Sequence, residues 1–465
     1  MIVAVDIGSG SVRVGLIAPE GIVHVARRGG ALALIPGRLT GIDLPVLRAR
    51  VADALAEVAE VASASGARIE TVTCTSIRYA TVWSGGGDDI AWANLARGDR
   101  EDVAALQAGM SDADLLRLGG WPTPLSLASR LRSARRWNLE PPEDAVPLSV
   151  AGWLLCEWGA AAHVDEVTWA DNRINAGELT REVSVVATGD TVGEYAGSVA
   201  GTEAWRGARL AVAPPDTVAA LHGLGDLAIG DAVAVAGTTT PVVAVADDDA
   251  AAAVADADDH AWLPFRSGTL LAESNAARTG EVVAAMSRLV APHKSPLSAA
   301  GGDDDEHDLP PGGVRSFLGP TLVAPRWLGM PAAPQGIEFS VPFTHVRPHH
   351  LRRSAVEANA WATDVHLRRV EAQARVRGRR IVCGGQADSR EFLELLAAAG
   401  GREVEAVSVE ATLVGAAAAV SGQSIPPPPV RVVTPDRRIG DEPRQWAARW
   451  WSRQDNAVAT GERDL

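Results

Sequence analysis

Two short apolar segments, each followed directly by a glycine-rich turn, open the two halves of the 465-residue chain. Residues 2–7 lead into the Gly-Ser-Gly-Ser turn at 8–11, and residues 232–235 lead into the Gly-Thr-Thr turn at 237–239. An apolar run bounded by such a turn is typical of a buried strand that enters a hairpin. Because the same unit occurs twice, the sequence predicts two related lobes with a cleft between them.

The spacing of apolar residues around these turns predicts alternating strands and helices. Residues 2–26 contain three short strands joined by tight connections, which indicates an antiparallel start. Residues 44–64 have helical spacing and composition, and residues 69–74 form an apolar strand. Residues 354–375 are again helical and precede an apolar strand at 379–383. This order is typical of an α/β protein.

We expect the chain to divide into two lobes and an extension. The N-terminal lobe is predicted at residues 1–228, the C-terminal lobe at 229–422 and the extension, which packs on the lobes, at 423–465. Four prolines at 426–429 interrupt regular structure before a last helical pattern that carries three tryptophans at 446–451. This helix either exposes an apolar stripe, which would suit a homodimer interface, or folds back on its own lobe.

The charge balance and the cysteines limit the possible partners. A net charge of −15 repels nucleic acid, although backbone N–H groups and Mg²⁺ can still hold a nucleotide. The N-terminus lacks the pattern of a signal peptide, and no uncharged apolar run reaches the ~18 residues of a membrane span. Cys74, Cys156 and Cys383 form no CxxC pair, which favours reduced buried thiols over a zinc site or disulfides. We therefore expect a cytoplasmic protein without nucleic acid or membrane partners.

Asp6 stands at the end of the first apolar segment, directly before the turn at 8–11. Its carboxylate could hold Mg²⁺, and the N–H groups and hydroxyls of the turn could approach phosphate oxygens, because glycine has no Cβ. The turn at 237–239 offers the same chemistry from the second half. The alternatives are a plain hairpin with a surface aspartate and an ordinary loop turn.

Asp216 follows two prolines and begins a helical pattern. At a strand-to-helix turn it is a candidate general base, because a carboxylate there can point into a cleft. The alternative is a helix N-cap, whose side chain accepts backbone N–H groups instead.

A third glycine turn, Gly384-Gly385, leaves the strand at 379–383. A Gly-Gly turn lets an adenine ring lie flat on the backbone, and small residues at 410–417 would let their helix pack close to that loop. An ordinary strand-to-helix turn is the alternative.

Four segments, in this order and spacing, resemble the FGGY family of carbohydrate kinases from residue 1 to about residue 420. DIGSGSVR is similar to the family's first phosphate motif, and AGTTTP is similar to its second. PPDTVAALHGLG resembles the stretch that bears the catalytic aspartate. IVCGGQADSREFLELLAAAGGREVEAVSVEATLVGAAAA resembles the adenosine-site region, and VPFTHVRPHHLRRSAVEANAW resembles the helix before it.

The resemblance implies an α/β, two-lobe fold of the actin-like and ribonuclease-H-like type, with ATP and sugar in a central cleft. It implies ATP-dependent phosphorylation of a sugar or polyol hydroxyl, with Asp216 as general base, Asp6 serving Mg²⁺, and ATP, ADP and a small polyhydroxy compound as partners. It makes a homodimer plausible. The residues that it assigns to the nucleotide are Gly8, Ser9, Ser11, Arg13, Gly237, Thr238, Thr239, Gly384, Gly385 and Gln386.

The segments that would form the sugar pocket depart from the family. The family's Trp-x-Asp-x-Arg motif is represented by Trp92, with Asn94 and Ala96 in the acidic and basic positions, and residues 163–171 match only loosely. Arg78 falls where several members contact substrate; a surface salt bridge is the alternative. A catalytically weak actin-like ATPase that acts as a regulator or reactivating partner is therefore the second functional hypothesis.

Overall fold

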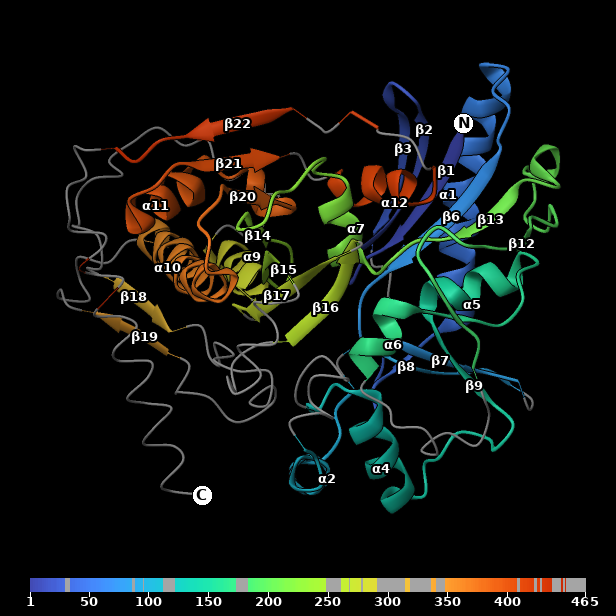
Figure 1. Ribbon diagram of the computed structural model, residues 1–465, viewed down its shortest axis with the longest axis horizontal. Coiled ribbons are helices and arrows are strands. Elements are labelled where there is room, and N and C mark those ends of the chain that lie inside the picture. Colours follow the sequence, from blue (N-terminus) through green and yellow to red (C-terminus); the bar gives the residue numbers. More distant parts are fainter. Residues whose placement is uncertain are drawn as a thin grey trace. The chain divides into compact units, whose positions relative to one another are not determined.

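The computed structural model forms two compact units that are discontinuous in sequence (Figure 1). The first comprises Met1–Leu227, Ala255–Leu270 and Glu410–Pro428, and the second comprises Ala228–Val254, Leu271–Val409 and Pro429–Leu465. The structure describes residues 1–29, 34–85, 88–94, 96–111, 122–172, 183–247, 261–266, 268–276, 279–290, 314–317, 336–339, 348–407, 410–421, 425–426, 429–436, 445 and 448.

The first unit is built on a six-stranded mixed sheet with the order β12-β13-β6-β1-β2-β3. Its hairpin β1-β2-β3 is antiparallel, as expected, and β6 and β13 run parallel to β1. The strands are β1 (Ile2–Ile7), β2 (Ser11–Ala18), β3 (Gly21–Gly29), β6 (Thr71–Ser76), β12 (Thr191–Glu194) and β13 (Arg209–Val212).

Helix α1 (Leu44–Ala64) covers one face of this sheet. The side chain of Asp43 caps its N-terminus by accepting the N–H of Val46 at 3.0 Å, and Pro45 fits the first turn, where no N–H donor is needed. Apolar residues three and four apart, such as Leu47 and Val51, are buried against β2 and β3. Other described helical segments of this unit include α5 (Val150–Glu157), α6 (Glu166–Asn172), η1 (Glu203–Trp205), α7 (Asp216–His222) and α12 (Ala411–Ser421).

A smaller sheet with the order β4-β5-β8-β7-β9 belongs to the same unit. Its strands are β4 (Leu34–Ile35), β5 (Gly41–Ile42), β7 (Thr81–Ser84), β8 (Ile90–Trp92) and β9 (Val146–Ser149). Helix α4 (Leu127–Trp137) packs on it through a cluster that includes Trp83 and Trp92, and α2 (Arg100–Ala108) lies beside α4. Two further short strands, β10 (Val164–Asp165) and β11 (Val185–Val186), pair with each other.

A second large sheet has the described order β16-β17-β15-β14-β20-β21-β22, and its strands from β17 onwards belong mainly to the second unit. Hairpin β14-β15 is antiparallel, and β20 and β21 run parallel to β14. The strands are β14 (Ala232–Val235), β15 (Pro241–Asp247), β16 (Ala261–Arg266), β17 (Thr269–Asn275), β20 (Arg380–Cys383), β21 (Val404–Val407) and β22 (Val430–Val433), and a separate pair is β18 (Val314–Phe317) and β19 (Gly336–Phe339).

The long helix α10 (Pro348–Ala374) packs on β14 and β15 and confirms the helix predicted at 354–375. Its buried Asp364 and Glu371 each accept a hydrogen bond from Arg380 at 2.7 Å, so the cation at the start of β20 is compensated. The other helices are α9 (Thr279–Val290), η5 (Gly385–Asp388) and α11 (Arg390–Gly400). Trp446, Trp450 and Trp451, on which the interface prediction rests, lie outside the described residues.

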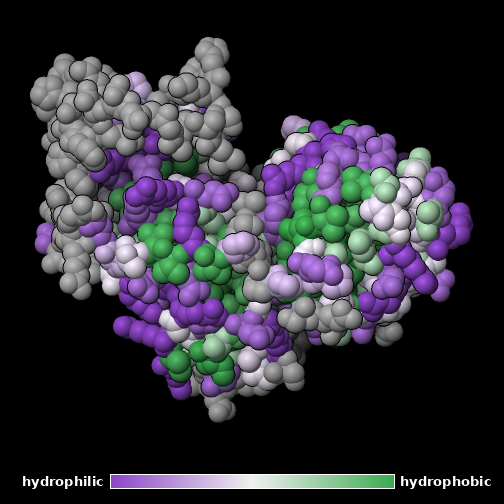
Figure 2. Space-filling model, turned by 90° about the horizontal axis from the view of Figure 1, so that it is seen from above, coloured by the Kyte–Doolittle hydropathy of each residue, from purple (hydrophilic) through white to green (hydrophobic). Residues whose placement is uncertain are grey.

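Hydrophilic side chains cover much of the described surface on the face in Figure 2, with hydrophobic patches among them. No described helix combines the length and apolar composition needed to cross a bilayer. The three cysteines are free, and burial raises the pKa of Cys383 to about 12 and that of Cys156 to about 11. The prediction of reduced, structural thiols is consistent with both observations.

Candidate active site

Three neighbouring parallel strands of the first unit end at the same edge of the sheet. Strands β13, β6 and β1 lie side by side and point the same way. The segments that follow them therefore meet at one edge, where open α/β sheets bind their ligands. These segments carry the turn at 8–11, Arg78 and Asp216, so the topology brings together residues that are up to about 200 positions apart.

Asp6 is fully buried near the end of β1 and pairs in register with Arg13 of β2. The two side chains form an ion pair, and among the described residues neither carboxylate oxygen accepts a further hydrogen bond. Burial raises the pKa of Asp6 and Arg13 opposes that rise. In the adjoining turn the N–H of Gly8 donates to the carbonyl oxygen of Ser11 at 3.0 Å, which leaves Ser9 exposed at the tip.

Asp216 is the first residue of α7, at the end of a firmly held connection. The hydroxyl of Thr75 on β6 donates to the carbonyl oxygen of Pro214 at 2.6 Å, which ties the turn to the neighbouring strand. Pro215, rather than Asp216, occupies the N-cap position, and no side chain caps this helix. The Oδ1 atom of Asp216 accepts the N–H of Thr217 at 2.7 Å, so the carboxylate is oriented locally but is not a regular cap.

The surroundings of Asp216 disfavour its charged form. Burial raises its pKa to about 7, and the Asp6 carboxylate adds to the rise, while the N–H and hydroxyl of Thr217 and the Arg78 guanidinium oppose it. A carboxyl group with a pKa near neutrality can both accept and release a proton under physiological conditions. This is the behaviour required of a general base.

Two glycines hold α7 against α12. A Cβ atom at Gly223 would overlap the carbonyl oxygen of Ala411, and one at Gly415 would overlap that of Ala219. The helices can approach this closely only because both contact points lack a side chain. The small residues of 411–417 pack on α7 within the first unit, and their predicted packing on the Gly384-Gly385 loop stays a prediction.

Arg78 is buried and forms a bidentate salt bridge with Asp171 of α6, with both N···O distances at 2.6 Å. The alternative interpretation of Arg78, a surface salt bridge, is correct in that a salt bridge exists, but this salt bridge is buried. Its neighbour Tyr79 has a φ of 64°, which is rare for a side chain with a Cβ and often marks a functional site. Asp171 was missed by sequence reasoning, since it lies in the loosely matched stretch 163–171.

In the second unit, β14 and β20 place the two predicted nucleotide turns side by side. The N–H of Ala236 donates to the carbonyl oxygen of Cys383 at 2.7 Å, and the N–H of Gln386 donates to that of Ala236 at 2.9 Å. Gly384 has a φ of 87°, and a Cβ there would lie 2.9 Å from the same carbonyl oxygen of Ala236. Gly385 is exposed, and a Cβ added to it would meet no protein atom within 4 Å.

The start of α9 packs on the Gly-Thr-Thr turn of the same unit. A Cβ at Gly280 would overlap the carbonyl oxygen of Gly237, and the hydroxyls of Thr240 and Thr279 share a hydrogen bond of 2.7 Å. Thr238 and Thr239 are exposed. Sequence reasoning missed Gly280, although a Thr-Gly pair at the start of a helical pattern was a usable signal, because helix N-termini favour anions.

Comparison with known proteins finds a family match for part of the chain. Residues 232–421 match the family model described as the C-terminal domain of the FGGY family of carbohydrate kinases. These residues resemble the C-terminal domain of FGGY carbohydrate kinases. A sequence comparison with curated proteins finds no match.

Solved structures similar to this chain include three kinases. Xylulose kinase from Rhodospirillum rubrum has 19% identity and a TM-score of 0.77, with 99% of each chain covered. Plasmodium falciparum glycerol kinase with ADP has 16% identity and a TM-score of 0.73, with 98% of each covered. Gluconate kinase from Lactobacillus acidophilus has 12% identity and a TM-score of 0.76, covering 100% of this chain and 99% of that one. These likenesses confirm the predicted α/β, actin-like fold along the whole chain.

The family implies Mg²⁺, and the residues at the sheet edge fit it. Mg²⁺ is commonly bound through one or two carboxylates together with substrate phosphates. Asp6 offers two buried oxygens whose only partner among the described residues is Arg13, and Asp216 is near enough for the Asp6 charge to raise its pKa. No group of three or more His, Cys, Asp or Glu residues suitable for a metal occurs in the described ranges.

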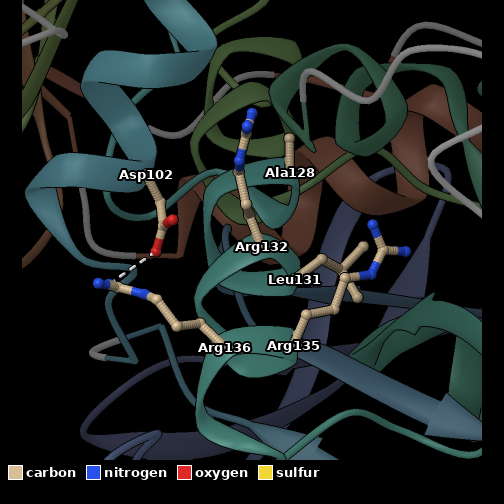
Figure 3. Close-up of a pocket in the computed structure, with 6 residues that line it drawn as sticks. All are labelled: Asp102, Ala128, Leu131, Arg132, Arg135 and Arg136. Carbon is tan, nitrogen blue, oxygen red and sulfur yellow. Dashed lines mark hydrogen bonds and ion pairs between the residues drawn. The ribbon is translucent and has the colours of Figure 1, made fainter.

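A groove elsewhere on the first unit contains none of the predicted site residues. Figure 3 shows its lining, in which Arg136 of α4 reaches Asp102 of α2 at 3.0 Å. Arg136 also bonds Asp99 and Glu101, so its charge is already shared among surface carboxylates. We assign this groove no role in the chemistry of the candidate site; it is lined by Asp102, Ala128, Leu131, Arg132, Arg135 and Arg136.

Proposed function

We propose that the chain is an ATP-dependent kinase that transfers the γ-phosphate of ATP to a hydroxyl of a sugar or polyol. The observation that carries this proposal is that Asp6 and Asp216 both lie at the carboxyl edge of β1, β6 and β13, close enough for the charge of Asp6 to raise the pKa of Asp216. The second unit adds two adjacent glycine turns of the kind that admit phosphate and purine. The family match and the likeness to xylulose, glycerol and gluconate kinases support the same activity.

Asp216 acts as the general base in this proposal. Phosphoryl transfer proceeds through a loose transition state, so the protein contributes mainly by positioning and by charge neutralisation. Two hydrogen bonds hold the Asp216 carboxylate in place: the N–H of Thr217 donates to the carboxylate, and the hydroxyl of Thr75 donates to the carbonyl oxygen of Pro214. From there it orients the acceptor hydroxyl and takes its proton as the oxygen attacks the γ-phosphorus in line.

Asp6 holds the magnesium ion, which neutralises charge on the terminal phosphates when it is bound. Arg13 lies beside Asp6 and is partly exposed, so its guanidinium can turn between the carboxylate and a phosphate oxygen. Gly8, Ser9 and Ser11 in the adjoining turn present backbone N–H groups and hydroxyls to the same oxygens.

The glycine turns of the second unit contact the nucleotide in this proposal. Gly237, Thr238 and Thr239 contact phosphate, and the Gly237 turn is braced from behind by Gly280 of α9. Gly384 lets the adenosine loop lie close to Ala236, because it has no side chain. Gly385, which has no protein atom near its Cβ position, borders the adenosine together with Gln386.

A coupled assay of ADP release tests this function. The panel contains glycerol, tetritols, pentitols, ketopentoses and gluconate, each with MgATP. Stimulation of ADP release by a member of the panel, together with a phosphorylated product by mass spectrometry, supports the kinase. Slow hydrolysis that no acceptor changes contradicts it and supports the weak regulatory ATPase. Light scattering of the same preparation tests the predicted homodimer.

The assay includes a matched pair of variants. Asp216→Asn removes the proposed base, whereas Asp226→Asn changes a fully exposed aspartate just beyond α7. Only the first is expected to abolish stimulation by the acceptor.

A further inference from the structure

Arg130 is a completely buried cation in the first unit, on the face of the small sheet next to the proposed site. It lies on α4, which packs against β7 and β8. Thr81 and Trp83 alternate on β7 and share one face, and Thr81 pairs with Trp92 on β8. The Arg130 guanidinium carbon lies 5.9 Å from the centroid of the Trp92 ring.

The hydrogen bonds of Arg130 leave its charge uncompensated. Its Nη2 atom donates to the hydroxyl of Thr81 at 3.1 Å, while Nε and Nη1 have no partner among the described residues. Burial lowers the pKa of Arg130 to about 9, in the direction expected for a cation without a counter-charge. The Nε1 atom of Trp83 is a second buried donor without an acceptor. The cluster therefore offers more N–H donors than acceptors among the described residues, at a cost that a folded protein rarely accepts without a function.

A chain of contacts joins this cluster to the proposed catalytic residues. Arg130 interacts electrostatically with Tyr79, whose hydroxyl accepts a hydrogen bond from Arg78 at 3.3 Å. Arg78 in turn lowers the pKa of Asp216. Arg78 donates two hydrogen bonds to the carboxylate of Asp171, which compensates its charge. Arg130, by contrast, has two N–H groups without an acceptor among the described residues.

We propose that Arg130 recognises a carboxylate on the acceptor substrate, so that the substrate class is a polyhydroxy carboxylic acid of the aldonate type. This inference rests on the proposed kinase function and names its substrate. A single guanidinium matches the single charge of a carboxylate, which also accepts two parallel N–H bonds. A phosphate dianion would call for a second uncommitted cation.

Trp92 and Tyr79 complete the recognition of such a substrate. Indole and phenol faces pack against the C–H faces of a polyol chain. Tyr79 is the partly exposed member of the group, with Arg78, Thr81, Trp83 and Trp92 buried behind it. Its backbone is left-handed, with a φ of 64°, a conformation that is rare outside glycine and clusters at ligand sites.

The test compares each C4 to C6 aldonate with the alditol of the same chain length and with the matching sugar monophosphate. For the wild type, kcat/KM is expected to favour the aldonate. Arg130→Gln should reduce that preference roughly 10- to 100-fold, the effect of losing a hydrogen bond to a charged group. Arg132→Gln, on the same helix but exposed, is the matched control and should leave the preference unchanged.

An unchanged preference in Arg130→Gln, or a wild type that favours the alditol or the sugar phosphate, overturns the inference while the kinase function stands. No acceptor-stimulated ADP release with any compound overturns the kinase function instead. Thermal shift of the wild type with aldonate or alditol, without ATP, supplies a readout that requires neither activity nor a folded variant. Stabilisation by the aldonate alone supports the inference, and equal or absent shifts contradict it.

Discussion

The two units of the molecule repeat one sheet and differ in what they place at its edge. The first runs β12-β13-β6-β1-β2-β3, and the second contains β22-β21-β20-β14-β15-β17 in the corresponding order. In both, a hairpin pairs with two consecutive parallel strands and then an antiparallel one. The weak repeat of glycine turns in the sequence thus corresponds to six matched strands.

The difference lies in the charge at equivalent positions. Two residues before the turn glycine, the first unit has Asp6 and the second has Val235. After the neighbouring parallel strand, the first unit has Arg78 with its partner Asp171, whereas the second has Gly384. The same topology therefore carries charged groups suited to proton transfer and a cation in one copy, and uncharged backbone donors suited to a nucleotide in the other.

The largest effect is expected from removing the proposed base on the charged side. Asp216→Asn should lower kcat by ~10²–10⁴-fold, since asparagine cannot accept a proton. ATP affinity, measured by calorimetry, should remain close to that of the wild type, because Asp216 is not among the residues that we propose to contact the nucleotide.

The stability of this variant separates catalysis from capping. Because burial raises the pKa of Asp216 to about 7, the folded state favours the protonated form, and its stabilising effect fades as pH rises from about 4 to 7. Asp216→Asn should therefore melt at or above the wild-type temperature at pH 8, with a smaller difference at pH 4. A loss of about 1 kcal/mol with activity kept would instead indicate a helix cap.

The next largest effect concerns the metal. Asp6→Asn should lower kcat by roughly 100-fold and raise the Mg²⁺ concentration needed for half-maximal rate, because Mg²⁺ prefers carboxylate ligands. The titration of rate against Mg²⁺ gives both values, and Mg²⁺-dependent nucleotide binding by calorimetry gives an independent readout. Asp53→Asn, which alters an exposed ion pair with Arg28, is the control. Unchanged Mg²⁺ dependence in Asp6→Asn would remove Asp6 from the metal site.

Features encoded in short stretches could be predicted from the sequence. The hairpin at β1-β2, the burial of Asp6's strand and helix α10 follow from local apolar spacing and turn chemistry. Asp216 could be named a candidate because the two prolines and the helical pattern lie next to it. The structure adds that Pro215 takes the cap position and leaves the carboxylate available.

Features that depend on contacts between distant segments could not be predicted from the sequence. The partner of Arg78 is Asp171, 93 residues later, in a stretch with no distinct pattern. Likewise Gly415 is required by a helix almost 200 positions earlier, and Gly280 by the turn at 237–239. In the sequence, such a close contact is visible only as an isolated glycine. The glycine alone does not indicate which segment packs against it.

A moderate effect is expected on the uncharged side, at Gly385. Gly385→Val adds a branched side chain where no protein atom lies within 4 Å, so the variant should fold. We expect the KM for ATP to rise about tenfold with little change in the KM for the acceptor, the sign of lost nucleotide binding. Gly384→Val is the contrasting variant, since its side chain would strain a left-handed backbone and press on Ala236; it should lose stability instead. Unchanged ATP affinity in Gly385→Val would exclude this loop from the nucleotide site.

The smallest effect is a shift in the pH profile, and it tests whether the charges on the first unit act on Asp216. The acidic limb of kcat/KM for MgATP reports the enzyme before the nucleotide binds, and we expect its midpoint near the Asp216 pKa of about 7. Arg78→Met removes a positive charge that lowers this pKa, so the limb should move to higher pH; Asp6→Asn removes a negative charge that raises it, so the limb should move to lower pH. Both shifts should stay within about one pH unit, because burial is the larger cause. Opposite shifts would locate the titrating base at Asp216 even where both variants are slow, since the midpoint does not depend on the height of the profile. A limb that stays in place in both variants would mean that another group accepts the proton.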